Sequence, residues 1–298
     1  MSLRTILKKN AFPAILGALA TLTVWNGYVA YDGLKLTKDE KLWLEMHEVC
    51  ENIENEFGIG CKTTPRASLA ETESKRVAAS YFHGSNRIEF YRDNLEDIAD
   101  DIKDHEVTHA ILFQTYEELT GKKFSYANYL GVGQDPSAKE ILSENGKLTD
   151  EIKDLGWKNG VYNDFVLERK LWRLQNENEK LLTQEFVTRM ISEGIATYVQ
   201  HNGDYAGTYE DSLKEFEETF GDLPDHIYDL NTLNIWDLRY SMGAAAVKET
   251  MDLGTKEAIE YFATHPPIGV KTFADVQEYF DTAKSEVLSE VEFWGGED

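Results

Sequence analysis

The sequence predicts an α+β fold in which a small N-terminal sheet precedes a mostly helical C-terminal half. Short runs rich in β-branched and aromatic residues lie before residue 92, whereas apolar residues recur at helical spacing through much of the later chain. An uncharged N-terminal stretch adds one hydrophobic helix before this domain. We therefore divide the chain into an N-terminal hydrophobic segment, residues 1–33, and one folded domain, residues 34–298.

The N-terminal segment has the charge pattern of a membrane-directed helix. Arg4, Lys8 and Lys9 precede a stretch of 22 residues without charge, from Asn10 to Tyr31, and roughly 20 apolar residues are enough to cross a bilayer core. The basic flank predicts a cytoplasmic N-terminus and an extracytoplasmic domain. We expect a retained signal anchor. The alternative is a signal peptide cleaved near Ala18-Leu19-Ala20, which would release a secreted protein.

The first elements of the folded domain are a helix and a hairpin. Thr37-Lys-Asp-Glu40 is a capping box that predicts a helix to about Phe57, where Gly58 ends it. The runs Arg76–Phe82 and Arg87–Tyr91 follow, and turn-forming residues separate them. This pattern predicts a β-hairpin immediately before the next helix.

The rest of the chain predicts helices separated by one long connection. A helix is expected to begin at Asp93 or Asn94 and to end near Thr120, because Gly121 follows. Residues 121–160 have mixed periodicity and several glycines, which indicate an irregular connection with room for one short helix. Further helices are expected at residues 162–178, 183–201, 208–220, 241–253, 255–264 and 272–287.

Composition and cysteine usage exclude some classes of function. The net charge is −24, so nucleic acid is not an expected partner, because phosphate binding depends on clustered Lys and Arg. Cys50 and Cys61 are the two cysteines, and they form no CxxC pair or Cys/His cluster, so a zinc finger is not expected. A disulfide between them and a pair of free thiols both stay open.

The segment His105-Glu106-Val107-Thr108-His109 carries the strongest functional signal. Histidines four residues apart project from the same face of an α-helix, and each neutral imidazole can ligate zinc. Glu106 is offset around the helix axis, so it can act as general base on the water of the metal. The alternative is two core histidines that ordinary hydrogen bonds satisfy.

A catalytic zinc site needs a third protein ligand, and Glu193 is the best candidate. It lies in a strongly apolar predicted helix, where a carboxylate needs a compensating cation. Gly194 and Ala196 are small enough to let this helix approach the helix of the two histidines closely. The alternatives are an ion pair between Glu193 and Arg189, four residues earlier, and a site that uses Glu185 instead.

HExxH followed by a Glu-Gly-x-Ala segment on a second helix resembles the gluzincin metallopeptidases, the thermolysin-like superfamily. The resemblance covers residues 76–201 and implies a zincin-like fold, peptide-bond hydrolysis, and one Zn²⁺ ion on His105, His109 and Glu193. The predicted hairpin resembles the edge strand that lines the substrate cleft of zincins. The sequence departs from the family at Thr197, where many members have an aspartate that orients a histidine ligand. The exopeptidase motif GxMEN is absent.

Tyr240 is the candidate for stabilising the oxyanion, which would make it a second catalytic residue beside Glu106. Its segment, Leu238 to Gly243, resembles the tyrosine-then-glycine segment that follows the ligand glutamate in several members of the superfamily. A packed core aromatic is the alternative interpretation of this residue. Tyr198 and His201 are rivals for the role, since both lie close to Glu193 in sequence.

These observations together predict a zinc metallopeptidase, more specifically an endopeptidase, that is membrane-tethered or secreted and acts on a peptide or protein substrate. One alternative is a membrane-tethered binding or scaffold protein that uses a zincin fold without catalysis. Another is a metal-dependent hydrolase that cleaves a non-peptide amide. The sequence carries no signal for the oligomeric state.

Overall fold

A computed structural model describes residues 37–70, 78–91, 98–159, 165–204 and 232–295, together with single positions between 207 and 218. The chain divides into two units, Met1–Lys41 and Leu42–Asp298. The predicted hydrophobic segment, residues 1–33, lies outside the described residues. Among the helices that are described, none has the length and apolar character needed to span a membrane.

Three short strands form one sheet. They are β1 (Arg66–Leu69), β2 (Ala79–Phe82) and β3 (Arg87–Phe90), in the order β1-β3-β2. β2 and β3 pair antiparallel across a 3₁₀ turn at His83–Ser85, which confirms the predicted hairpin. β1 pairs parallel with β3, and the sequence did not reveal it because its four residues lack a clear apolar alternation. β2 is therefore an edge strand of the described sheet.

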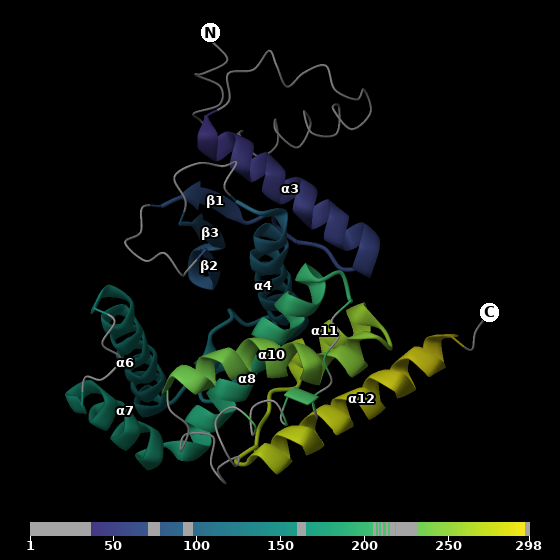
Figure 1. Ribbon diagram of the computed structural model, residues 1–298. Helices are drawn as coiled ribbons and strands as arrows, with labels where there is room; N and C mark the ends of the chain where they lie inside the picture. The colour runs from purple at the N-terminus through teal and green to yellow at the C-terminus, as the bar shows by residue number, and fades with distance from the viewer. Residues whose placement is uncertain are drawn as a thin grey trace. The chain divides into compact units, whose positions relative to one another are not determined.

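Helices form most of the remaining described chain, and the architecture is α+β as predicted (Figure 1). Their bounds are α3 (Lys38–Phe57), α4 (Asp100–Thr120), α5 (Tyr126–Tyr129), α6 (Pro136–Asn159), α7 (Phe165–Glu177), α8 (Glu179–Gln200), α10 (Thr232–Met251), α11 (Thr255–Thr264) and α12 (Phe273–Gly295).

The start of α3 and its contact with the following loop agree with the sequence. Thr37 N donates to Glu40 Oε2 at 2.7 Å and Glu40 N donates to Thr37 Oγ1 at 3.3 Å, which completes the predicted capping box. Cys50 of α3 is joined to Cys61 by a disulfide, with their Cα atoms 5.6 Å apart. Of the two alternatives for the cysteines, the structure has the disulfide.

Helix α4 begins later than the sequence predicts. Ala99 has an extended backbone and precedes the first helical residue, Asp100, while the predicted start at Asp93 or Asn94 lies outside the described residues. Asp100 and Asp101 place carboxylates in the first turn, where the helix dipole favours negative charge. The predicted end is confirmed, because Gly121 follows the helix with a φ of 67°.

The interpretation of residues 121–160 as an irregular connection is wrong. Most of this stretch is α6, a helix of 24 residues. Leu148 and Ile152 of α6 lie one turn apart and pack on Leu171 of α7 in a small separate core. Gly146 and many polar residues conceal this periodicity, and tertiary packing outweighs the weak local preference.

Helices α8 and α10 lie side by side (Figure 1), and their backbones meet at two glycines. A Cβ atom built on Gly194 would lie 2.2 Å from the carbonyl oxygen of Gly243, and one built on Gly243 would lie 2.4 Å from that of Met190. Only glycine fits at such a crossing. The expectation that Gly194 brings α8 close to the helix of the two histidines is wrong, because this glycine faces α10.

Candidate metal centre

Helices α4 and α8 bring the three predicted ligands together. His105 and His109 lie one turn apart on α4, with ring centroids separated by 4.9 Å and ring planes at 84°. Both Nε2 atoms approach the same atom of α8, Glu193 Oε2, at 3.2 Å from His105 and 3.4 Å from His109. The predicted convergence of two imidazoles and one carboxylate is present.

The spacing of the donor atoms suits a tetrahedral metal ion. One ligand atom from each of His105, His109 and Glu193 can be chosen so that all lie within 4.8 Å of one another. In a tetrahedral zinc site with bonds of about 2.0–2.1 Å, ligand atoms are separated by about 3.3–3.4 Å. Among the described residues, this is the group of histidine and acidic side chains that can hold a metal ion.

Hydrogen bonding leaves the Nε2 atom of His105 without a proton in the neutral ring. His105 Nδ1 lies 2.9 Å from Gln200 Oε1, which is an acceptor, so Nδ1 carries the proton. The bare Nε2 then faces a carboxylate oxygen at 3.2 Å, and two acceptors do not attract each other. Either an imidazolium or a cation between the two atoms is needed. A metal ion satisfies all three ligand atoms at once.

The charges of the cluster also favour a cation or protons between the three side chains. Burial lowers the pKa of His109, but the neighbouring Glu193 carboxylate outweighs it, so the pKa lies above the ordinary value. Burial likewise raises the pKa of Glu193, but His109 and His105 hold it well below the usual range. The cluster therefore stabilises positive charge between its members, in the form of protons or of a metal ion.

Each imidazole has a second partner on α8 that the sequence did not indicate. His109 Nδ1 lies 2.8 Å from Ser192 Oγ, and His105 Nδ1 is bonded to Gln200. Gln200 lies seven residues after Glu193, two helical turns along the same face, and that spacing was the available signal. The hydroxyl of Thr197 is buried and makes no hydrogen bond among the described residues.

Glu106 is buried beside the three candidate ligands and near the edge strand β2. The backbone of Tyr81 in β2 lies close enough to the Glu106 carboxylate to favour its charged form, which acts to lower its pKa. Burial raises the pKa of Glu106, and the two histidines oppose this without cancelling it. A carboxylate with a raised pKa is a stronger base than a solvated one, so Glu106 is suited to proton transfer beside a metal ion.

Tyr240 lies at the margin of the cluster. Its ring is 6.2 Å from the ring of His105, at an interplanar angle of 30°, and 40% of the residue is exposed. The alternative interpretation of Tyr240 as a packed core aromatic is wrong. The rival Tyr198 donates its hydroxyl to Asp252 at 2.9 Å, and His201 follows α8 as its C-terminal cap.

Neither the ion pair between Glu193 and Arg189 nor a site that uses Glu185 as the third ligand is present. Arg189 does not pair with Glu193, because its Nε and Nη2 atoms donate to Glu185 Oε1 at 3.0 and 2.7 Å. Asn145 donates to the other oxygen of Glu185 at 3.0 Å. Glu185 is therefore occupied by its own cation and amide, and does not serve as a ligand.

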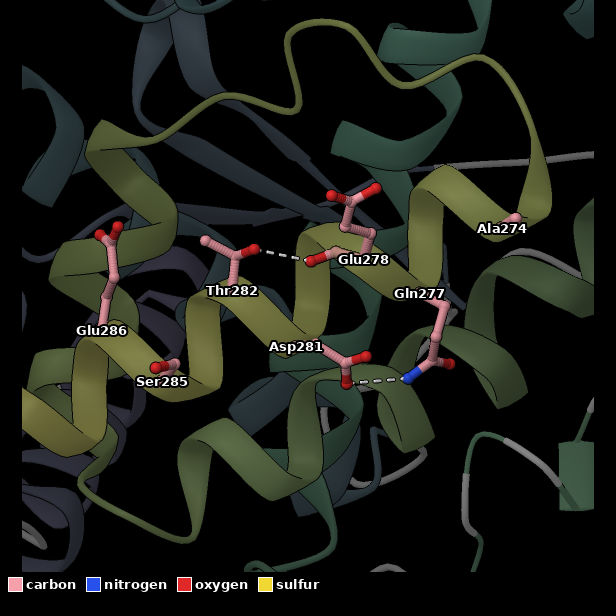
Figure 2. A pocket seen from close by; sticks show the side chains of 7 residues that line it. All are labelled: Ala274, Gln277, Glu278, Asp281, Thr282, Ser285 and Glu286. Carbon is pink, nitrogen blue, oxygen red and sulfur yellow. Dashed lines mark hydrogen bonds between the residues drawn. The ribbon is translucent and has the colours of Figure 1, made fainter.

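A hollow on the outer face of α12 shows what a non-ligating acidic surface looks like (Figure 2). It carries Glu278, Asp281 and Glu286, but no histidine. The side chain of Asp281 accepts from Gln277 of the same helix at 3.0 Å. Because these acids are not gathered around a common point, the surface is not a second metal candidate.

No protein-family model, curated protein or solved structure matches this chain. The residues themselves indicate a function: His105, His109 and Glu193 can hold a metal ion, and Glu106 lies beside them.

Proposed function

We propose that the protein is a zinc-dependent peptidase of the gluzincin type, with a zincin-like fold. The observation that carries this proposal is the approach of two imidazole Nε2 atoms to one carboxylate oxygen, at 3.2 and 3.4 Å, with a buried general-base candidate on the same helix. The donor set of two nitrogens and one oxygen is typical of catalytic zinc, which keeps one coordination position open.

When bound, zinc supplies a Lewis acid that activates water and polarises the scissile carbonyl. Glu106 removes the proton from the attacking water and passes it to the leaving amine. The hydroxyl of Tyr240 donates a hydrogen bond to the oxyanion, a role that its partly exposed position beside His105 supports. Burial of Glu106 favours this proton transfer because it raises the pKa of the carboxyl.

The substrate is proposed to be an extended peptide that lies along β2. One edge of this strand pairs with β3, and the backbone of Tyr81 within it lies near enough to Glu106 to influence the pKa of that carboxyl. An extended peptide that adds to such an edge places its carbonyl groups beside the metal ligands. The family resemblance favours an endopeptidase in this arrangement.

The location is proposed from the N-terminal charge pattern. A basic flank followed by an uncharged stretch of 22 residues, Asn10 to Tyr31, supports a single membrane anchor and an extracytoplasmic catalytic domain. The disulfide between Cys50 and Cys61 supports the same location, because disulfides persist in oxidising compartments.

The decisive experiment compares the wild-type chain with Glu106→Gln in detergent solution. Glu106→Gln is expected to keep one zinc per chain and to lose about 10²–10⁴-fold in the turnover of a denatured protein substrate. Glu118→Gln is the matched control, since Glu118 lies on α4 but pairs with Lys62 on the surface. Equal turnover in Glu106→Gln would refute the mechanism. Zinc binding without any cleavage by the wild type would favour the scaffold alternative.

A further inference from the structure

We propose that Gln200 is a positioning residue that relays a hydrogen bond from Asp101 to His105 and thereby sets the imidazole tautomer that can bind a metal. The proposal depends on the metal centre and does not require the protein to cleave peptides. Gln200 is the last residue of α8, and Asp101 lies in the first turn of α4. The relay therefore joins the two helices beside the ligands.

The orientation of the Gln200 amide follows from its two partners. Its Nε2 donates to Asp101 Oδ2 at 3.2 Å, and its Oε1 faces His105 Nδ1 at 2.9 Å. The reversed amide would place an oxygen against the Asp101 carboxylate, which is repulsive. Asp101 therefore orients the amide.

The oriented amide in turn selects the tautomer of His105. An amide oxygen at Nδ1 requires the proton to be on Nδ1, which leaves Nε2 free to coordinate. A reversed amide would favour a proton on Nε2, the atom 3.2 Å from Glu193, and would block the metal. The sequence of contacts from Asp101 through Gln200 to His105 thus has one consistent direction.

The other ligand lacks this selection. Ser192, the partner of His109 Nδ1 at 2.8 Å, has a hydroxyl that can donate or accept, so it fits either tautomer. Both partners are neutral. A carboxylate partner makes an imidazole a more basic ligand. With the neutral amide of Gln200 as its partner, His105 is therefore expected to bind zinc less tightly than it would with a carboxylate partner.

Three variants remove or reverse the hydrogen bonds of the relay. Gln200→Leu removes the relay. Asp101→Asn removes the group that orients the amide. The double variant Asp101→Asn/Gln200→Glu restores both hydrogen bonds, with the Asn amide donating to a carboxylate that accepts from His105. Asp100→Asn is the matched control, because Asp100 pairs with Lys103 and not with Gln200.

The experiment measures the zinc dissociation constant of each full-length variant by competition with a chromophoric chelator. Gln200→Leu is expected to weaken zinc binding about 10–100-fold, Asp101→Asn less, and Asp100→Asn not measurably. The double variant is expected to bind zinc at least as tightly as the wild type. Thermal unfolding of the metal-free proteins checks that each variant is folded, and ¹⁵N NMR of the imidazole reports the tautomer of His105.

Wild-type zinc affinity in Gln200→Leu, with an unchanged His105 tautomer, would overturn the relay. So would a double variant that binds zinc no better than Gln200→Leu. The outcome is separable from the proposed function. A chain that follows the predicted affinity order but cleaves no peptide keeps the relay and loses the peptidase, and normal cleavage with equal affinities does the reverse.

Discussion

Two carboxylates on α8, eight residues apart in sequence, have different surroundings. Glu185 is 1% exposed and has its own cation, because Arg189 donates two hydrogen bonds to it. Glu193 faces two imidazole nitrogens, and at least one of them is bare in the neutral ring. A buried carboxylate whose counter-charge comes from the chain is structural. One that faces only potential ligand atoms has a place for a cation from outside.

The largest expected effect is on zinc binding, which should depend on Glu193 and not on Glu185. Glu193→Gln replaces a charged ligand by an amide, so zinc affinity is expected to fall by more than the roughly 100-fold limit that is typical for partners of ligands. Glu185→Gln should retain one zinc per chain, because Glu185 contacts no ligand. Metal analysis after dialysis measures both. Zinc retained by Glu193→Gln and lost by Glu185→Gln would reverse the comparison.

Glu185, in contrast, is expected to matter for the stability of the fold through its ion pair with Arg189. Arg189→Met leaves Glu185 buried without its cation, which is expected to lower the free energy of unfolding by about 3–5 kcal/mol. Denaturant unfolding of the metal-free chain measures it.

The double variant Glu185→Met/Arg189→Met provides the control for this change. Removing both charges avoids an uncompensated carboxylate, so most of the lost stability should return. Equal destabilisation in the single and double variants would show that the ion pair matters through packing rather than charge.

The smallest expected effect is on the contact between α8 and α10 beside Glu193. Gly194→Ala places a methyl group against the backbone of Gly243, and this overpacking should cost about 1–3 kcal/mol of unfolding free energy. Zinc affinity should also fall, because Gly194 adjoins Glu193. Gly146→Ala on α6 is the control. Outside its chain neighbours and the backbone of its own helix, no atom lies within 4 Å of its added Cβ, so stability should hold or rise by up to about 1 kcal/mol. A neutral Gly194→Ala would mean that α8 and α10 separate easily.

The part of the site that lies within one helix could be predicted from the sequence. The spacing of His105 and His109 fixes their common face on α4, and the apolar surroundings of Glu193 single it out. The hairpin and the capping box at Thr37 were also predictable, because each depends on residues close together in sequence.

What the sequence missed depends on how the helices cross. The contact of Gln200 with Asp101 spans 99 positions and exists because α8 ends beside the first turn of α4. The contact of Gly194 with Gly243 is of the same kind, since nothing in either segment indicates which helix the glycine faces. Helix α6 was missed for a related reason, because its apolar face is recognisable only once α7 covers it.

The backbone contact between α8 and α10 also determines what can move. At Gly194 and Gly243 the two backbones meet directly, which resists sliding of one helix along the other, so α8 and α10 are expected to shift as one body. Glu193 and Tyr240 would then travel together, whereas the two histidines and Glu106 travel with α4. A motion of α8 and α10 away from α4 would separate these two groups. A metal ion bound to residues of both groups would oppose that motion.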